Sequence, residues 1–367
     1  MKKIYTPKTI IFYLIKEFNS SILIFFSIFI SLVLLSNFIE EIIFFRDKEI
    51  QEELIIKAFL LSLFKTPTII ISMMPFIFLF SGIFFFAKLI RVNEITPMSL
   101  SGFSKIYISS IPAVYSFIIG MIIIVAATPI VSELAKYYEA SKQKYSNNEN
   151  LIVMSNTGLW IKEKTLKNTY LIRTDQIKDQ NFTSLKNISI YKFDNNNNFI
   201  QRIDGNFATI EDKKWKIPNA TINANNEITK ISNLNYITTI DFKKIKSFFT
   251  NPDIYSFWNI LKEQENMQNM GYYGQELIIK FNKYLSLPIM LFSMVIISTI
   301  FTINLNYRFN NFGYAFIGIL TGIFFYFLGD LSIAIGKSGK LPLVLSVWVP
   351  TILIMTISIF SLISEKE

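Results

Sequence analysis

The residue types that the chain lacks narrow its possible chemistry. None of its 367 residues is histidine or cysteine. This composition removes imidazole general bases, thiol chemistry, disulfide bonds and every zinc site that needs His or Cys ligands. We expect no cofactor, no bound metal and no catalytic centre. A serine–lysine pair stays open as an alternative, and such a pair would make the chain a membrane hydrolase.

Two short motifs point to activities that the rest of the chain does not support. Gly336-Lys337-Ser338 resembles the end of a phosphate-binding loop, but the earlier glycine and the preceding strand of that loop are missing. The Asn-X-Ser/Thr triplets that begin at Asn181, Asn187 and Asn219 are expected by chance in an Asn-rich chain. We therefore expect no nucleotide site and no enzyme active site in this chain.

The residue best placed to bind a partner is an acid in a short polar stretch between two long apolar runs. Glu94 follows Arg91 there, and the stretch ends near Gly102. We predict a short helix over about residues 92–102 that Asn93 or Thr96 caps and that Gly102 ends in the left-handed conformation. A partner can grip such a helix and tilt the apolar helices attached to it. The candidate contact residues are Glu94, Arg91, Ile95 and Met98.

Ordinary alternatives remain for these residues. Glu94 could be a solvated loop carboxylate, because single exposed acids are common. Arg91 could simply follow the preference of cytoplasmic loops for basic residues.

A second group of polar residues lies at the opposite ends of the apolar runs. Asn37, Glu41, Arg46 and Lys48 stand at the end of the first run, and Asp330 near the end of the fifth. Acids at membrane depth usually face a bundle interior or a cavity, because exposure to lipid is costly. All five are therefore candidate functional residues. The alternative is that they are interfacial residues that meet water.

Long apolar runs set the fold class. A bilayer core of about 30 Å needs about 20 apolar helical residues. Six runs reach that length, at residues 21–45, 69–90 (after Lys65 and Pro67), 106–130, 285–305, 312–335 and 341–363. The first run is too long for a cleavable signal peptide, and no small-residue cleavage site follows it. The sequence therefore predicts a polytopic α-helical membrane protein with six transmembrane helices.

Basic residues predict which side of the membrane each loop occupies. One side collects Lys2, Lys3, Lys8, Lys16, Lys88, Arg91, Lys105 and Arg308, and the other collects Arg46, Lys48, Lys337 and Lys340. The richer side is expected to be cytoplasmic, with both termini there. The net charge of +9 fits basic flanks and anionic lipid better than nucleic acid, so no nucleic-acid partner is expected.

The residue pattern in the polar middle of the chain predicts β-strands. Apolar and polar residues alternate at 185–193, 199–203 and 236–242, and Asn, Asp and Gly clusters separate the runs. Short strands of this kind favour a sandwich or a jellyroll-like domain outside the membrane. We expect helices one to three in residues 1–132, the periplasmic β-domain in 133–250, a linking helix in 251–275 and helices four to six in 276–367.

The order of several short motifs resembles the LptF/LptG family of lipopolysaccharide-export permeases. Glu94-Ile95 and Ser101-Gly102-Phe103 match the family's acidic loop motif. Further matches follow at Gly158–Lys162, Ile188–Tyr191, Leu287-Pro288, Arg308, Gly318-Ile319, Gly322–Tyr326, Leu341-Pro342, Trp348 and Pro350. Each motif is weak alone, but their order covers nearly the whole chain. The segments Gly158–Lys162 and Ile188–Tyr191 look more like LptG than LptF.

The resemblance implies a set of partners in the bacterial inner membrane. They are a cytoplasmic ABC ATPase dimer, a sibling six-helix permease, a periplasmic bridge protein with a jellyroll fold, and lipopolysaccharide itself. The lipid would enter between helices one and five and pass to the β-domain. Hydrolysis would belong to the ATPase, and Glu94 would couple it to this chain.

The resemblance also suggests contacts to the lipid substrate, and it makes candidates of Asn37, Glu41, Arg46, Lys48 and Asp330. Trp160, Tyr170, Leu171, Ile188, Ile190 and Tyr191 are candidates for an apolar inner face of the β-domain. LptG-like proteins tend to place basic residues at the end of helix one, where this chain has Asn37, Glu40 and Glu41. Two other functions stay open: a transmission protein that an ATPase drives without moving lipid, and a membrane scaffold. A lipid-sized apolar cavity between helices one and five would separate a transporter from both.

Overall fold

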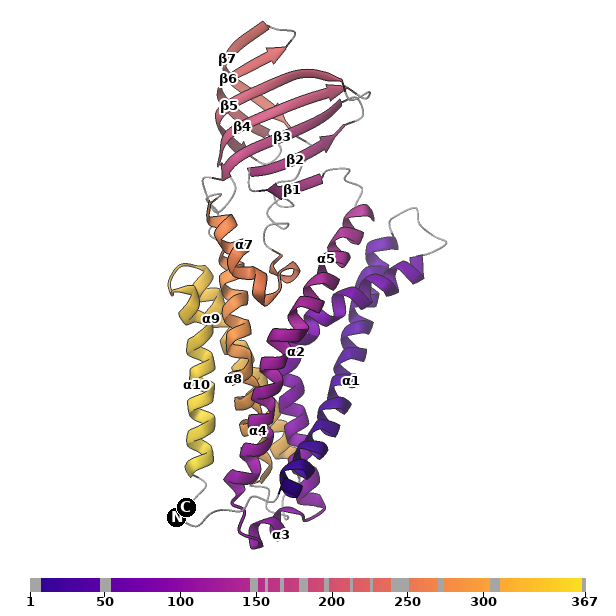
Figure 1. Cartoon of the computed structure of the whole chain (residues 1–367), viewed down its shortest axis with the longest axis vertical. Helices are drawn as coiled ribbons and strands as arrows, with labels where there is room; N and C mark the ends of the chain where they lie inside the picture. Colours follow the sequence, from indigo (N-terminus) through magenta and orange to yellow (C-terminus); the bar gives the residue numbers. More distant parts are fainter. Residues whose placement is uncertain are drawn as a thin grey trace. The chain divides into compact units, whose positions relative to one another are not determined.

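A computed structural model describes residues 8–46, 54–145, 151–155, 158–165, 168–177, 184–194, 198–211, 214–224, 227–238, 251–269, 274–303 and 311–364. The chain divides into two compact units. The first contains Met1–Glu139 and Ile279–Glu367, and the second contains Ala140–Ile278. Figure 1 labels the elements of both units along the chain.

Six helices in the described part of the chain are long and apolar enough to cross a membrane. They are α1 (Lys8–Arg46), α2 (Leu54–Arg91), the continuous helix of α4 (Lys105–Ile122), η1 (Ile123–Ala127) and α5 (Thr128–Tyr145), then α8 (Gln275–Ile303), α9 (Asn311–Lys337) and α10 (Leu343–Ser364). The predicted six-helix class is confirmed. A short helix, α3 (Ile95–Leu100), lies between α2 and α4.

Four of these helices extend well beyond the predicted apolar runs, and one of them is α8, which begins at Gln275 and not near residue 285. Helix α1 begins at Lys8, and α2 begins at Leu54 and passes through Pro67 and Pro75. The predicted start of the second helix after Pro67 is therefore wrong. A hydropathy window detects only the part that matches the bilayer core, and membrane helices tolerate proline where neighbouring groups satisfy the freed backbone. The third helix continues to Tyr145, so residues 133–145 are helical and not part of the sheet.

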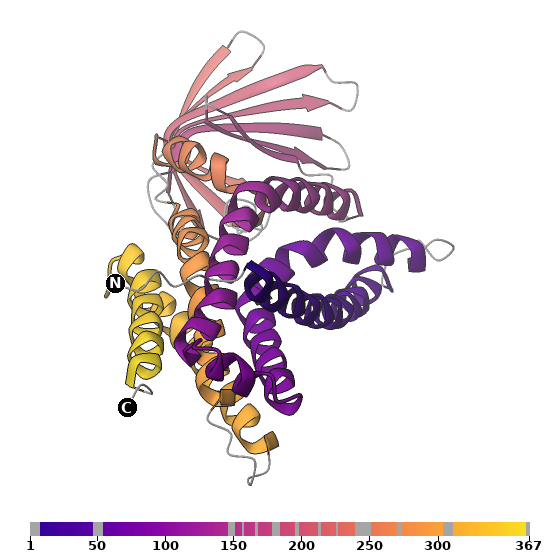
Figure 2. The ribbon, with the colours of Figure 1, turned by 60° about the horizontal axis from the view of Figure 1, so that its bottom comes forward.

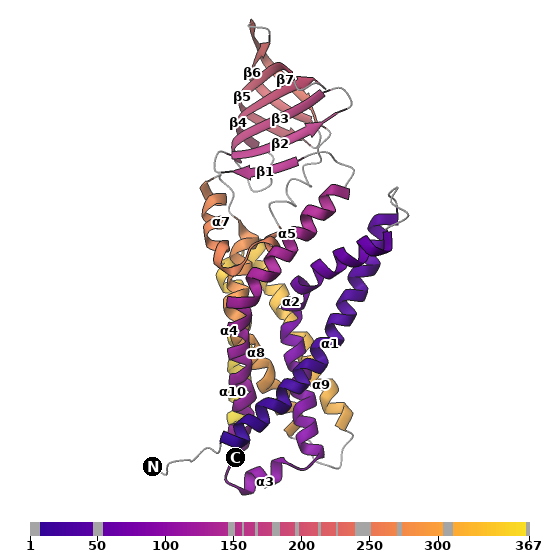
Figure 3. The same ribbon diagram turned by 45° about the vertical axis from the view of Figure 1, so that its right-hand side comes forward.

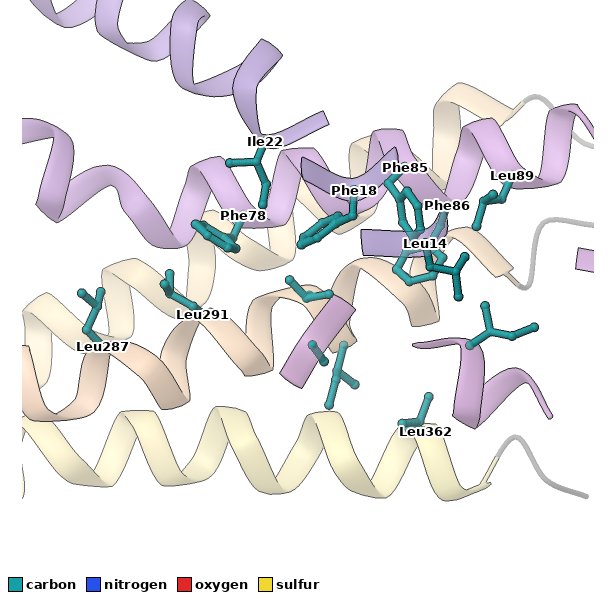
Figure 4. Packing of buried hydrophobic residues seen from close by; sticks show 14 of the residues in the cluster. Leu14, Phe18, Ile22, Phe78, Phe85, Phe86, Leu89, Leu287, Leu291 and Leu362 are labelled. Atoms are coloured by element: carbon teal, nitrogen blue, oxygen red, sulfur yellow. The ribbon is translucent and has the colours of Figure 1, made fainter. Parts of the chain in front are cut away.

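Aromatic and aliphatic side chains form the core of the helical unit. Helices α1 and α2 lie side by side in Figures 1 and 2. Figure 4 shows the main cluster, to which α1, α2, α8 and α10 contribute Leu14, Phe18, Ile22, Phe78, Phe85, Phe86, Leu89, Leu287, Leu291 and Leu362. Small residues allow close approach: a Cβ placed on Gly120 of α4 would lie 2.7 Å from the Cα of Pro288 on α8. Tight packing of this kind holds membrane helices together where the hydrophobic effect cannot.

The second unit contains the predicted β-domain. Its described residues form one antiparallel sheet of seven strands whose spatial order is the chain order. The strands are β1 (Leu151–Ser155), β2 (Gly158–Lys164), β3 (Asn168–Ile177), β4 (Ser184–Asp194), β5 (Phe199–Glu211), β6 (Lys214–Ala224) and β7 (Glu227–Ile237). The predicted strands at 185–193 and 199–203 lie within β4 and β5. Of the predicted strand at 236–242, Tyr236 and Ile237 are the last residues of β7, and residues 239–242 lie outside the described part.

The sheet twists strongly (Figure 3). Side chains from its second strand and from the end of its last strand meet. Glu163 of β2 is buried and accepts hydrogen bonds from the hydroxyls of Tyr236 (2.9 Å) and Thr238 (3.0 Å) at the end of β7. This curled, jellyroll-like sheet is followed by η2 (Pro252–Ile254) and α7 (Phe257–Asn269), in the region where a linking helix was predicted.

Candidate functional site

Local backbone geometry builds the turn that carries Glu94. Asn93 has a φ of 59°, in the left-handed region that Asn adopts more readily than most residues. The hydroxyl of Thr96 donates to Oδ1 of Asn93 at 2.9 Å. The N-cap of α3 is Glu94, without a side-chain capping bond, so the predicted capping by Asn93 or Thr96 is wrong. Gly102 follows α3 with a φ of 92°, as predicted for its end.

Two polar contacts connect this turn region to α1. The hydroxyl of Tyr13 donates to Oε2 of Glu94 at 2.7 Å. One turn further along α1, Glu17 pairs with Lys88 of α2 at 2.5 Å. Figure 3 shows α3 at the end of the helical unit where α1 begins and α2 ends. Glu94 is therefore half-buried and bonded within the chain, and is not a freely solvated loop carboxylate.

The apolar residues of α3 point to two different surroundings. Ile95 and Met98 are partly buried against the cluster that contains Leu14 and Phe18 of α1. Leu100 is 84% exposed, and Val92, just before the turn, is 57% exposed. Arg91 is exposed as well.

Of the four candidate contact residues, Arg91 and Glu94 thus keep access to a partner, while Ile95 and Met98 serve mainly as packing. Sequence reasoning missed Leu100 and Val92. Helical spacing could have identified Leu100 as a residue on the outer face of the helix, since residue 100 does not share a face with residues 95 and 98.

The candidates at the far end of α1 lie in contacts between helices. Glu41 is fully buried, and its Oε1 accepts a hydrogen bond of 2.7 Å from the hydroxyl of Tyr138 on α5. Asn37 is buried and donates to Oγ1 of Thr66 on α2 at 3.1 Å. These two residues hold α1, α2 and α5 together, and neither is displayed on the outer surface of α1.

The remaining charged candidates are more accessible. Glu40 is ion-paired with Lys65 of α2 at 2.6 Å. Arg46 is exposed at the end of α1, and Lys48 lies outside the described residues. Asp330 of α9 faces Lys283 of α8 at 3.7 Å, with both side chains about half exposed, at 54% and 50%. Of the described candidates in the helical unit, Asn37 and Glu41 therefore serve internal contacts, while Arg46 and Asp330 stay accessible.

Strand register divides the candidates of the β-domain between two faces. Ile190 is paired with Ile172 and Ile203, and all three are buried. Trp160 is paired with Arg173 and lies on the opposite face, where the guanidinium is 5.5 Å from its ring. Side chains alternate between the faces of a sheet, so Leu171 and Tyr191 share the face of Trp160, while Tyr170 and Ile188 share that of Ile190. The six candidates cannot form one inner surface.

The hydrogen bonds from Tyr236 and Thr238 to Glu163 lie on the buried face of the sheet. Burial, together with the charge of Glu163 and the hydrogen bond to it, raises the pKa of Tyr236 above its ordinary value. In the described residues of both units, no three or more Asp and Glu side chains gather closely enough to hold a metal ion.

Comparison with known proteins gives one match and one absence. A family model described as lipopolysaccharide export system permease LptF/LptG matches residues 12–364. This span runs from α1 to the end of α10 and includes the whole sheet. A search of curated proteins finds no match to this chain.

Proposed function

Because the chain belongs to the LptF/LptG family of lipopolysaccharide export permeases, we propose that it is the LptG-like permease subunit of an ABC transporter. The transporter would extract lipopolysaccharide from the inner membrane and pass it through the β-domain toward the outer membrane. A separate cytoplasmic ATPase dimer would hydrolyse ATP. The assignment to the LptG type is supported by Gly158–Lys162 and Ile188–Tyr191, which form β2 and the centre of β4.

The loop around α3 carries this proposal, since it has the features that an ATPase docking element needs. It presents a half-buried carboxylate, an exposed Arg91 and two exposed apolar side chains, Leu100 and Val92. The inner face of α3 packs on the core of the helical unit, so force on the loop reaches the membrane helices. A basic residue of the ATPase would pair with Glu94, and the apolar side chains would fill a groove beside it.

The proposed orientation follows from charge. Lys88, Arg91 and Lys105 flank α3, and the preference for basic residues on the inside supports a cytoplasmic side for α3 and for both termini. Three spans precede the sheet, so the β-domain lies in the periplasm.

The surfaces of α1 and α9 suit lipid and a second permease. Their outward side chains are large and apolar: Leu23, Ile24, Ile28, Leu32, Leu35, Ile39 and Ile43 on α1, and Phe316, Leu320, Ile323, Phe324, Phe327 and Leu331 on α9. We assign these stripes to the lipid entry surface shared with the sibling permease. The burial of Glu41 removes a carboxylate that would repel the phosphates of lipid A, and Arg46 with Lys48 would attract them.

Reconstitution tests the proposal. The chain, a sibling permease and the ATPase are placed in liposomes that contain lipopolysaccharide, with a soluble bridge protein outside. ATP should drive the lipid onto the bridge protein, and vesicles without this chain should give none. Hydrolysis that proceeds without lipid transfer would favour a transmission protein. Failure of the three proteins to associate would contradict the proposal.

A further inference from the structure

We propose that Tyr13 of α1 is a positioning residue, which orients the Glu94 carboxylate for docking and ties the docking loop to α1. The inference rests on the proposed function, because it assigns a role to Tyr13 only if an ATPase docks at α3. It goes beyond that function by naming the helix that receives the force and the side chain that transmits it.

The first argument is geometric. The Tyr13 hydroxyl and Oε2 of Glu94 are 2.7 Å apart, although the residues are 81 positions apart in the chain. The Tyr13 side chain is partly buried against the cluster that contains Phe18 and Phe85, which limits the positions that its hydroxyl can take. A carboxylate offers about four lone-pair sites, and one bond to Tyr13 leaves acceptors for a cation of the partner.

The second argument concerns the conformational freedom of the Glu94 side chain. A free glutamate side chain loses rotamer freedom when it binds, and this loss weakens docking. The bond to Tyr13 restricts Glu94 before a partner arrives. Neither Asn93 nor Thr96 does so, because these two side chains bond to each other. Tyr13 is therefore the group, among the described residues with contacts to Glu94, that can preorganise the carboxylate.

The third argument concerns transmission. Ile95 and Met98 of α3 pack on the same cluster as α1, and Glu17 of α1 pairs with Lys88 of α2. A pull on Glu94 then acts on α1 through the Tyr13 hydroxyl and on α2 through the backbone. The helix that we propose to line lipid entry is thereby joined to the docking loop by a side-chain contact.

The experiment uses the complete complex of this chain, its sibling and the ATPase. Two quantities are measured: the affinity of the ATPase for the permease pair, and the lipid transferred per ATP hydrolysed. Tyr13→Phe should lower the affinity by about two- to tenfold, because the Glu94 side chain would then lose its rotamer freedom only when the ATPase docks. It should also lower the lipid transferred per ATP. Tyr115→Phe is the matched control, because Tyr115 packs on the same cluster and its hydroxyl lies 3.4 Å from Asn19, not near Glu94.

A double-mutant cycle separates positioning from packing. If Tyr13 acts through Glu94, Tyr13→Phe should have no further effect on affinity in a Glu94→Ala background. An equal loss in both backgrounds would mean that Tyr13 only stabilises the fold, and would overturn the proposal. Wild-type affinity and transfer in Tyr13→Phe would overturn it too. Wild-type affinity in Glu94→Ala alone would instead contradict docking at α3, and with it the proposed function.

Discussion

The carboxylate of Glu163 on β2 accepts a hydrogen bond of 2.9 Å from the hydroxyl of Tyr236 on β7, five strands away in the order of the sheet. Both side chains are buried. Among the described residues, the second and last strands therefore meet at a charged contact, and that contact makes the stability of the domain sensitive to both residues.

Tyr236→Phe should destabilise the β-domain by about 1.5–3 kcal/mol, the usual value for a hydrogen bond to a charged group. Hydrogen exchange of β2 and β7 in the full chain measures the loss. The pKa of Tyr236 is higher in the folded than in the unfolded chain. Its contribution to the free energy of unfolding is therefore complete below the unfolded pKa of about 10, and it is lost as the pH rises from there through the folded pKa. The variant should lack this alkaline loss. Tyr191→Phe, on the opposite face, is the control, and equal exchange in the two variants would refute the role of the contact with Glu163.

Gly120→Ala should destabilise the helical unit by about 1–3 kcal/mol, because the added methyl group overlaps the backbone of Pro288 and forces α4 away from α8. Thermal unfolding in detergent measures the change. Gly329→Ala is the matched control, since a Cβ at Gly329 of α9 meets nothing within 4 Å. A control that loses as much stability as Gly120→Ala would show that helix flexibility, and not packing, is responsible.

Leu100→Ser and Met98→Ser should separate docking from folding. Leu100 is exposed, so its substitution should leave the unfolding temperature unchanged and reduce ATPase capture. Met98 packs inward, so its substitution should lower the unfolding temperature. Pull-down with the ATPase, together with thermal unfolding of each variant, checks both effects. The reverse pattern would place the docking surface on the other side of α3.

Glu94→Lys should insert normally but assemble poorly, because the new charge repels the basic residue that we propose for the ATPase. Loss of one partner of such a pair typically costs about 2–5 kcal/mol. Glu133→Lys makes the same charge change on α5, at the other end of the span that α4 begins, where Glu133 pairs with Lys136. This control should assemble as the wild type does. Normal lipid export by Glu94→Lys would show that α3 is not the coupling element.

Reporter fusions test the orientation. A reporter after Asn198 should read as periplasmic, and one after Asn310 as cytoplasmic. The same reading for both positions would contradict the six-span topology. Opposite readings with the sides exchanged would leave the spans intact and reverse the orientation inferred from Lys88, Arg91 and Lys105.

The class of the fold was predictable from the sequence because burial in lipid requires long apolar runs, and those runs are visible without a structure. Helix ends were less predictable. Helix α2 continues through Lys65, which pairs with Glu40, and through Pro67, so neither charge nor proline marks its start. Contacts to a neighbouring helix decided those positions, and a single sequence does not contain them.

The candidate site was predictable in part for a similar reason. The acidic residue of the loop stood out by type and position, but its bond to Tyr13 joins two segments whose packing the sequence does not reveal. The prediction of which side chains share a face of the sheet failed for a different reason. Asn187 has a φ of 54° within β4, and the residue pairs with β3 and β5 stop at Lys186 and resume at Ile188 in the same register. The buried side chains are then Leu185, Ile188 and Ile190, which simple alternation does not give.

The sequential order of the seven strands has a consequence for biosynthesis. Each strand pairs with the one made immediately before it, so every hairpin closes over a short stretch of chain. Local pairings of this kind form quickly, and chains generally fold from the N-terminal side as they are made. The ladder can therefore be complete before the ribosome has made α8, α9 and α10. The last step would be the meeting of Glu163 with Tyr236 and Thr238, which requires β7 and seals the sheet only once its final strand has emerged.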